Sequence, residues 1–169
     1  TQQAVKNLAN EGIVNGVHDV GDIMYDIMLF GRTLVERQPT ALARYGLHSR
    51  GYSLATVHRA ENTDSKDRLS QIFSAFGKIA GRHPVVVALH PRTRKCLEGY
   101  GIAITGNVRI LDPLSYLEMI ELELSARVML TDSGGVQKEA FFVGVPCLTL
   151  RDETEWVETL HGNWNILVG

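Results

Sequence analysis

The sequence predicts an α/β fold of three layers, in which a mostly parallel β-sheet lies between two layers of helices. Short apolar runs alternate with longer helical patterns and short loops, which is the pattern of β-α-β units. One of these runs, residues 85–90, is apolar on both faces, as strands that are covered on both sides are. Of the 169 residues, 44% are hydrophobic and 21% are charged, so the chain can form one globular domain with a buried core.

In the first half, the earliest strong pattern is a long amphipathic helix over residues 22–44, with Met24, Ile27, Met28 and Leu34 on one side. Residues 53–58 predict a strand, and the polar stretch 59–66 follows it. The next helix ends near Arg82. Its apolar residues form a single stripe at helical spacing: Leu69, Ile72, Phe73, Phe76, Ile79 and Ala80.

The second half repeats this alternation. Ser115 and Glu118 form a capping-box pattern, which predicts that a helix begins there. Further helical patterns cover residues 136–143 and 152–160. The predicted strands of this half cover residues 85–90, 107–111, 127–131 and 145–150.

Composition excludes several classes of protein. Seventeen Lys and Arg against nineteen Asp and Glu give a net charge of −2, which argues against a nucleic-acid partner held by phosphate contacts. No apolar run approaches the ~20 residues of a membrane span, so no membrane partner is expected. Cys96 and Cys147 lie far apart in the sequence, which favours reduced thiols in a cytoplasmic protein over a disulfide or a zinc site.

The chain begins without Met and without a signal-peptide pattern, which is typical of a fragment or a processed chain. Residues 12–21 have the weakest pattern and predict a linker or hinge. We therefore interpret residues 1–169 as a single domain and residues 1–21 as its interdomain segment.

Polar residues follow three of the predicted strands. They are His58 with Arg59, His90, and the run Asp132-Ser133-Gly134-Gly135. Ligands of open parallel sheets bind at the carboxyl ends of the strands, so these residues predict the rim of a binding cleft.

The strongest single signal is the segment Thr131-Asp-Ser-Gly-Gly-Val-Gln-Lys-Glu139, between a strand and a helix. Glycines allow close backbone approach, and the free N–H groups of a helix start favour an anion such as phosphate. Ser133 adds a hydroxyl donor, and Glu139 can accept two hydrogen bonds from a ribose diol. The segment matches neither the dinucleotide fingerprint nor the P-loop. The alternative interpretation is an ordinary helix capped by Asp132.

The strand-tip residues also have simpler interpretations. His58 alone is explained as a histidine hydrogen-bonded at the sheet edge, His90 as the end of its strand, and Arg59 with Glu61 as a solvated pair. A metal site of His58, His90 and Asp132 lacks any supporting ligand spacing. We therefore expect neither a metal nor a cofactor.

Taken together, these segments resemble the non-hydrolysing UDP-N-acetylglucosamine 2-epimerases. The H-R-x-E-N and D-S-G-G-x-Q-x-E motifs, in this order, carry the resemblance most specifically. The matching segments are Glu11-Gly-Ile, Val20-Gly-Asp-x-Met-Tyr-Asp26, Thr56-Val-His-Arg-Ala-Glu-Asn-Thr63, His90-Pro-Arg92, Leu111-Asp-Pro-Leu-x-Tyr116, Leu130-Thr-Asp-Ser-Gly-Gly-Val-Gln-Lys-Glu-Ala140 and Gly144-Val-Pro-Cys-Leu-x-Leu-Arg-Asp-x-Thr-Glu-Trp-Val-Glu158.

The resemblance implies two Rossmann-like domains in an architecture similar to glycosyltransferase B, with the active site between them. This chain resembles the second domain, and the first domain is missing. The resemblance implies that Ser133, Gly134 and Gly135 receive the diphosphate of a UDP-sugar and that Glu139 holds the ribose. It also implies that His58 lies against the diphosphate and assists the departure of UDP.

Other roles follow from the same resemblance. Met119 stands where the uracil often meets an aromatic ring. Arg59 and His90 match positions that line the site of a second, activating UDP-N-acetylglucosamine. Arg151, Thr154 and Glu155 match the sugar side of the site.

The chemistry that the resemblance implies is an elimination followed by re-addition of UDP, with acid–base carboxylates on the first domain. The full-length enzyme is expected to be a homodimer that converts UDP-N-acetylglucosamine to its 2-epimer, and the isolated chain is expected to be inactive. The Trp-Val form at residues 156–157 also occurs in relatives that act on UDP-diacetamido-glucuronate, which leaves the sugar open. A glycosyltransferase of the same architecture and a binding module without catalysis are the two alternatives of a different kind.

Overall fold

A computed structural model describes all 169 residues, and its centre is a six-stranded sheet in the order β3-β2-β1-β4-β5-β6. Every neighbouring pair is parallel. The strands cover Ser53–Thr56 (β1), Val85–Ala88 (β2), Val108–Leu111 (β3), Val128–Thr131 (β4), Cys147–Thr149 (β5) and Asn165–Leu167 (β6).

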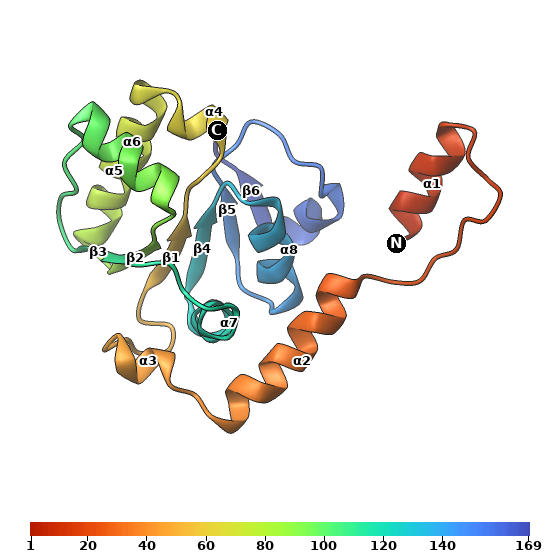
Figure 1. Cartoon of the computed structure of the whole chain (residues 1–169), viewed down its shortest axis with the longest axis horizontal. Helices are drawn as coiled ribbons and strands as arrows, with labels where there is room; N and C mark the ends of the chain where they lie inside the picture. Colours follow the sequence, from red (N-terminus) through yellow and green to blue (C-terminus); the bar gives the residue numbers. More distant parts are fainter.

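Helices cover both faces of the sheet, which gives the predicted three-layer α/β/α fold. Figure 1 shows α5 and α6 on one side and α2, α7 and α8 on the other. The helices cover Gln2–Asn10 (α1), Ile23–Arg37 (α2), Ala41–Arg44 (α3), Ala60–Thr63 (α4), Lys66–Ala80 (α5), Pro91–Tyr100 (α6), Tyr116–Ser125 (α7) and Gly134–Phe142 (α8), and a 3₁₀ segment covers Val157–Asn163 (η1).

The core is divided between the two faces because successive strand residues point to opposite sides. Leu54, Val86 and Met129 pack with side chains of α7 and α8. Ala55 and Leu130, each the next residue of its strand, pack with the apolar stripe of α5. Leu69, Phe73, Phe76 and Ala80 of that stripe are buried, as the sequence predicts.

Strand order reverses between β1 and β4, which lie side by side although two strands separate them in the chain. At such a reversal the loops after the two strands turn to opposite faces, and a crevice opens at their carboxyl ends. The loop after β1 begins with Val57 and the loop after β4 with Asp132. This topology therefore brings His58 and the Asp132-Ser133-Gly134-Gly135 run to one crevice.

The helix predicted over residues 22–44 is wrong in its length. The structure breaks it into α2 and α3 at Gln38, because Pro39 follows and disfavours helical geometry in the residue before it. The predicted apolar side is also only partly correct. Met28 is buried together with Gly31 and Val35, whereas Ile27 and Leu34 are exposed.

Gly31 fixes the orientation of α2. A Cβ atom at this position would overlap the side chain of Ile120 on α7. The backbone of α2 therefore lies against α7 along the Met28–Gly31–Val35 line, and most of the other apolar side chains of the helix are exposed.

Residues 152–160 do not form the predicted helix. Residues 152–156 have no regular helix, and a 3₁₀ segment that contains non-helical residues begins at Val157. The structure also contains elements that the sequence patterns did not indicate, namely α4, α6 and β6, and a helix within the segment 1–21.

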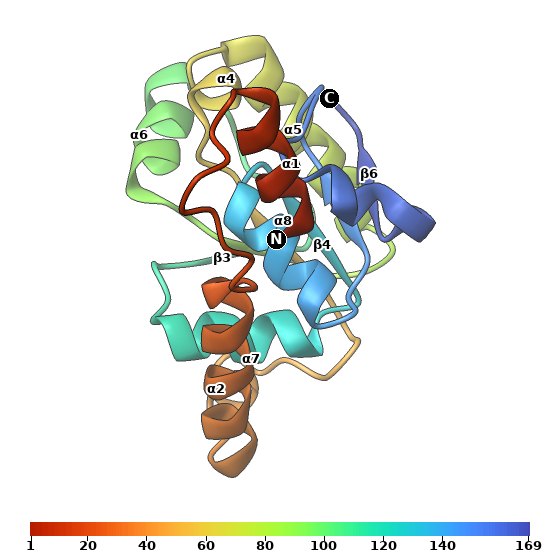
Figure 2. The same ribbon diagram turned by 90° about the vertical axis from the view of Figure 1, so that its right-hand side faces the viewer.

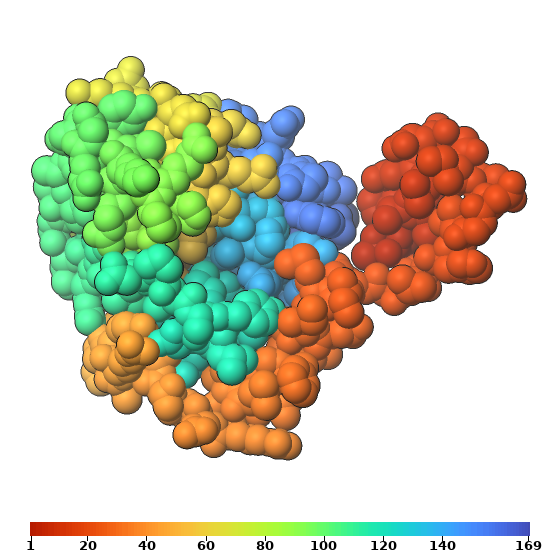
Figure 3. Space-filling view, viewed as in Figure 1, coloured from red at the N-terminus to blue at the C-terminus, as the bar shows by residue number.

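Residues 1–21 extend away from the body of the molecule. Figure 1 shows α1 and the loop after it as an arm that joins the body at α2, and in the turned view of Figure 2 α1 lies in front of the body. The space-filling view shows the same arm standing beside the body (Figure 3). No residue of α1 is buried. None of the helices combines the length and hydropathy that a membrane span needs.

Candidate functional site

Asp132 links the loops at the strand tips. Its carboxylate is fully buried and accepts hydrogen bonds from the backbone N–H groups of His58, at 3.0 and 3.1 Å, and of Arg59, at 3.0 Å. The amide of Asn62 donates to it at 3.0 Å and to the Leu150 carbonyl at 2.9 Å. The tips of β1, β4 and β5 are thus held together by one carboxylate and one amide.

This arrangement corrects two interpretations of Asp132. It does not cap α8, because Ser133 is the N-cap and its Oγ accepts from the Val136 N–H at 3.4 Å. It is also unavailable as a metal ligand beside His58 and His90, because its oxygens face backbone amides. No group of three metal-ligating side chains converges in the structure.

The first turn of α8 opens into the crevice. Gly134 and Gly135 are its first two residues, so their N–H groups are among those that a helix start leaves without an intrahelical partner. The N-cap of α8 is bonded to the end of β4, because the Ser133 N–H donates to Thr131 Oγ1 at 3.0 Å. Thr131 Oγ1 in turn lies 2.5 Å from Thr56 Oγ1 of β1. These contacts hold the start of α8, with its free N–H groups, in a defined position.

The loop after β5 lies over this helix start. A Cβ atom at Gly134 would lie 2.6 Å from Glu155 Oε1 and 2.9 Å from Trp156 Nε1, so a larger residue would have to displace these two side chains. Thr154 Oγ1 donates to Gln137 Oε1 of α8 at 2.6 Å, and the ammonium of Lys138 lies 4.1 Å from the Trp156 ring centroid. The predicted sugar-side residues therefore do lie beside the predicted diphosphate residues.

Charges also meet at this loop. Arg151 Nη1 donates to Glu155 at 2.7 Å, and Arg59 Nη2 lies 3.4 Å from the same carboxylate. Arg59 pairs with Glu155 rather than with Glu61, which corrects the simple solvated-pair interpretation. Burial raises the pKa of Glu155, but a backbone hydrogen bond and the two cations together lower the pKa more, so it lies below its ordinary value.

Several donors around the α8 start have no protein partner. They are Gln137 Nε2, Arg151 Nε and Trp156 Nε1. Gln137 and Arg151 are buried. Buried donors without partners are costly to a fold, so they indicate a site that a ligand or water completes.

The two histidines share a pocket with Met119. The ring centroids of His58 and His90 lie 5.8 Å apart. Both rings line a cavity of about 200 Å³, to which α7 contributes Met119 and α8 contributes Val136. His90 also caps α6, because its Nδ1 accepts from the Arg92 N–H at 3.1 Å. The cavity is mostly apolar and lies beside the α8 start, a setting that suits a flat ring more than an anion.

Glu139 lies farther along α8, where it faces α7. It is only 9% exposed, and burial raises its pKa, while hydrogen bonding with Glu123 and Tyr116 counteracts that shift. Tyr116 and Met119 lie one turn apart on α7, and Val136 and Glu139 lie one turn apart on α8. The apolar pair Met119 and Val136 therefore lies next to the polar pair Tyr116 and Glu139.

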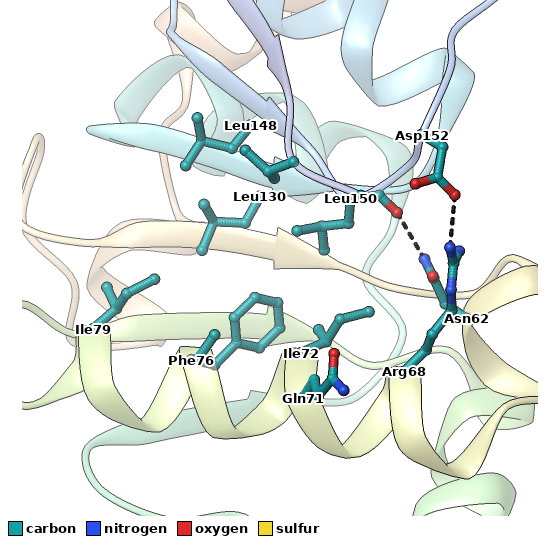
Figure 4. A pocket seen from close by; sticks show the side chains of 13 residues that line it. Asn62, Arg68, Gln71, Ile72, Phe76, Ile79, Leu130, Leu148, Leu150 and Asp152 are labelled. Atoms are coloured by element: carbon teal, nitrogen blue, oxygen red, sulfur yellow. Dashed lines mark hydrogen bonds and ion pairs between the residues drawn. The ribbon is translucent and has the colours of Figure 1, made fainter.

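A larger apolar cavity, of about 560 Å³, lies on the α5 side of the sheet and shares Asn62 and Leu150 with the contacts described above. Figure 4 shows it between α5 and the strands β4 and β5, with Ile72, Phe76 and Leu148 inside and a polar cluster at one end. In that cluster Arg68 is paired with Asp152 at 2.6 Å. The cavity offers no free cation to a nucleotide and is not part of the candidate site.

Sequence patterns did not indicate three residues of the site. Asn62 lies inside the H-R-x-E-N segment, but its bonds to Asp132 and Leu150 depend on the fold. Trp156 contacts α8 through a loop that sequence predicted as helix. Glu123 is fully buried beside Glu139, and the one signal for it was a charged residue one turn after the apolar Ile120.

Comparisons with known proteins agree on one family. The profile of the family described as UDP-N-acetylglucosamine 2-epimerase matches residues 1–169. A Methanococcus maripaludis protein named UDP-N-acetylglucosamine 2-epimerase homolog is 50% identical, over 100% of this chain and 48% of its own length. The UDP-2,3-diacetamido-2,3-dideoxy-D-glucuronate 2-epimerase of Pseudomonas aeruginosa is 48% identical, over 100% of this chain and 47% of its own length.

A solved structure gives the same result. The UDP-GlcNAc 2-epimerase of Methanocaldococcus jannaschii, in complex with UDP-GlcNAc and UDP, is 39% identical and matches with a TM-score of 0.92. The match covers 100% of this chain and 49% of that one. The chain thus spans about half the length of the relatives that it matches.

Proposed function

This chain belongs to the UDP-N-acetylglucosamine 2-epimerase family, and we propose that it is the nucleotide-binding half of a UDP-sugar 2-epimerase. The observation that carries the proposal is the α8 start, which opens at the strand-order reversal beside His58. Because the relatives are about twice as long, the other half would be a further domain, to which residues 1–21 would lead. The full-length enzyme would be a homodimer.

The diphosphate would bind at the first turn of α8. The N–H groups of Gly134 and Gly135 and the hydroxyl of Ser133 are the donors, and the positive end of the helix dipole adds to the attraction. The absence of a Cβ atom at Gly134 permits close approach under Glu155 and Trp156.

The nucleoside would lie along the α7–α8 pair. Glu139 would accept hydrogen bonds from the two ribose hydroxyls, since a carboxylate matches a diol. Uracil would occupy the mostly apolar cavity against Met119, whose thioether packs well on a flat ring. On α8, Val136 beside the cavity and Glu139 lie one turn apart, which supports a uracil next to Val136 and a ribose next to Glu139.

The reaction would be an elimination and re-addition. A base removes the C2 proton as the C1–oxygen bond to UDP breaks, which leaves a 2-acetamidoglucal and free UDP. Reprotonation of C2 on the other face and re-addition of UDP at C1 give the epimer. His58 would stabilise the departing diphosphate by hydrogen bonding, and the carboxylates that move the C2 proton would belong to the other domain.

The sugar would lie on the side of Arg151, Thr154 and Glu155, which are held over α8. The unpartnered donors of Arg151 and Trp156 support this position, because a sugar presents oxygen acceptors. Arg59 and His90 lie at the neighbouring strand tips, where a second nucleotide-sugar would act as activator.

A second candidate substrate is UDP-2,3-diacetamido-glucuronate. The relative from Pseudomonas aeruginosa that is named for this sugar is 48% identical, close to the 50% of the Methanococcus maripaludis relative. Incubation of the full-length protein with each sugar, followed by chromatography of the two epimers, separates the candidates. Transfer of a sugar to an acceptor, without free epimer, would indicate a glycosyltransferase instead.

Nucleotide choice tests the proposed site directly. Calorimetry on the full-length protein is expected to give tighter binding of UDP than of ATP or NAD. Glu139→Gln is expected to weaken UDP more than pyrophosphate, because the lost contact is to the ribose. Equal losses for the two ligands would remove Glu139 from this role, and tighter ATP or NAD binding would contradict the proposed site.

A further inference from the structure

The geometry points to Glu123 as a positioning residue for nucleotide recognition: its fully buried carboxyl group, which no nitrogen or hydroxyl donor meets, donates a hydrogen bond to Glu139 and fixes that side chain for the ribose. This inference rests on the proposed role of Glu139 as ribose acceptor. Glu123 itself touches no nucleotide.

The burial of Glu123 requires an explanation. Its side chain is fully buried between α7 and the body, and neither oxygen meets a nitrogen or hydroxyl donor. No Lys, Arg or His forms an ion pair with it. An ionised carboxylate in this position would lose its hydration without compensation, at a cost of several kcal/mol.

The groups that face Glu123 carry no positive charge. They are Glu139 on α8, Tyr116 at the start of α7, Cys147 on β5 and Tyr52 before β1. The Tyr52 hydroxyl already donates to the Leu122 carbonyl at 2.7 Å. Burial, and then the nearby Glu139 charge, raise the pKa of Glu123 well above its ordinary value. Glu123 is therefore the partner that keeps the proton.

A protonated carboxyl group is a donor, and the acceptor within its reach is the Glu139 carboxylate. The bond holds one oxygen of Glu139 on the α7 side. The hydrogen-bonding partners Glu123 and Tyr116 also oppose the rise that burial causes in the pKa of Glu139. The pKa of Glu139 therefore rises less than burial alone would raise it, and its side chain has a fixed orientation.

The fold does not need an acid at this position. A leucine or methionine fills a similar volume, and replacing a buried polar group with an apolar one is often neutral or stabilising. The sister residue on the same helix shows the contrast. Glu121 is also buried, but its two oxygens accept from three backbone N–H groups of the α3 start. Glu123 accepts no hydrogen bond from the backbone of another element.

The test uses UDP and pyrophosphate as probes on the full-length protein, with two variants of Glu123. Glu123→Leu removes the donor and is expected to weaken UDP about tenfold, the size of one charge-assisted hydrogen bond, with pyrophosphate unchanged. Glu123→Gln keeps a neutral donor and is expected to retain UDP affinity near neutral pH. Glu121→Gln, a buried carboxylate on the same helix that faces α3, is the matched control and is expected to leave the ratio of the two affinities unchanged.

The pH profile supplies a readout that packing alone would not move. As pH rises on the alkaline side, Glu123 loses its proton and repels Glu139, so wild-type UDP affinity is expected to fall relative to pyrophosphate affinity. Glu123→Gln has no proton to lose, and its ratio is expected to stay flat. The wild-type profile needs no variant to fold.

Each failure has a distinct signature. If Glu139→Gln weakens UDP selectively while Glu123→Leu binds UDP as the wild type does, Glu123 has no positioning role and the ribose site stands. An alkaline fall that persists in Glu123→Gln overturns the inference in the same way. If Glu139→Gln leaves UDP affinity unchanged, the ribose site and the role of Glu123 fail together.

Discussion

His58 occupies the crevice rim, and its ring is half-buried at the tip of β1. Its position depends on its backbone N–H, which Asp132 holds, and not on core packing by the ring. In the full-length enzyme we expect His58→Asn to change the free energy of unfolding by no more than about 0.5 kcal/mol. Epimer formation is expected to fall about 10²- to 10⁴-fold, the range for loss of a positioned proton-handling group. A large fall in thermal midpoint with near-normal turnover would contradict this role.

Gly134 gives a second test at the scale of one residue. Its missing side chain leaves the space that Glu155 and Trp156 approach, so Gly134→Ala must displace the Glu155 carboxylate and the Trp156 ring. We expect UDP affinity to fall, measured by calorimetry, while the far-ultraviolet circular dichroism spectrum is retained. Gly99→Ala on α6 is the control, because a methyl group there meets no atom within 4 Å and Ala favours a helix by about 1 kcal/mol over Gly. Unchanged UDP affinity in Gly134→Ala would place the diphosphate elsewhere.

For single residues, the sequence predicts which polar side chains lie near the site, but it does not predict their hydrogen-bond partners. His58, Ser133 and Gly134 meet in one crevice, as strand tips in a parallel sheet predict. The use of Asp132 depends on which amides the neighbouring loop presents, and no local pattern encodes that. Glu123 and Glu139 are sixteen positions apart in the chain, and only the packing of α7 on α8 brings them together.

Among the elements, α3 shows how a short helix survives through a distant contact. The three N–H groups at its start, from Thr40 to Leu42, donate to the Glu121 carboxylate at 2.9 Å each. A helix of four residues has no stability of its own, so this carboxylate supplies what the sequence of α3 lacks.

We therefore expect Glu121→Ala to lower the free energy of unfolding by about 2–3 kcal/mol, because buried donors to a charged acceptor lose their partner. Chemical denaturation of the full-length protein measures the change. Glu36→Ala is the control: its exposed ion pair with Arg32 is worth at most about 0.5 kcal/mol. Equal effects of the two substitutions would show that the α3 start finds other partners.

Elements with strong periodicity are predictable from the sequence, and the missed ones have identifiable reasons. The stripe of α5 and the Ser115–Glu118 capping box are confirmed. Helix α6 is mostly polar, so its signal lies at its ends, in Pro91 at the first turn and Gly101 with φ of 65° after the last. Strand β6 has three residues and pairs with β5 alone, which leaves too few positions for a pattern.

At the scale of the whole molecule, the separation of nucleotide binding from proton transfer leads to a prediction about activity. In the proposed mechanism, the N–H donors at the start of α8 bind the diphosphate, and the other domain handles the C2 proton. We expect the isolated chain to release no UDP from UDP-N-acetylglucosamine, even at high protein concentration, as followed by a coupled UDP assay. The full-length protein is the positive control. Elimination or epimerisation by the isolated chain would contradict the proposed division of roles.

Helix α2 carries the feature with the widest consequence. Six of its apolar side chains have 36% or more of their surface exposed, and Ile23 and Phe30 reach 69% and 66%. Contiguous bare apolar surface of this kind drives association in water. Two chains that associate through α2 bury these side chains, and this association stabilises the folded form by mass action. The melting temperature of the isolated chain should therefore rise with protein concentration. Static light scattering over a dilution series would register the same equilibrium as a rising apparent mass.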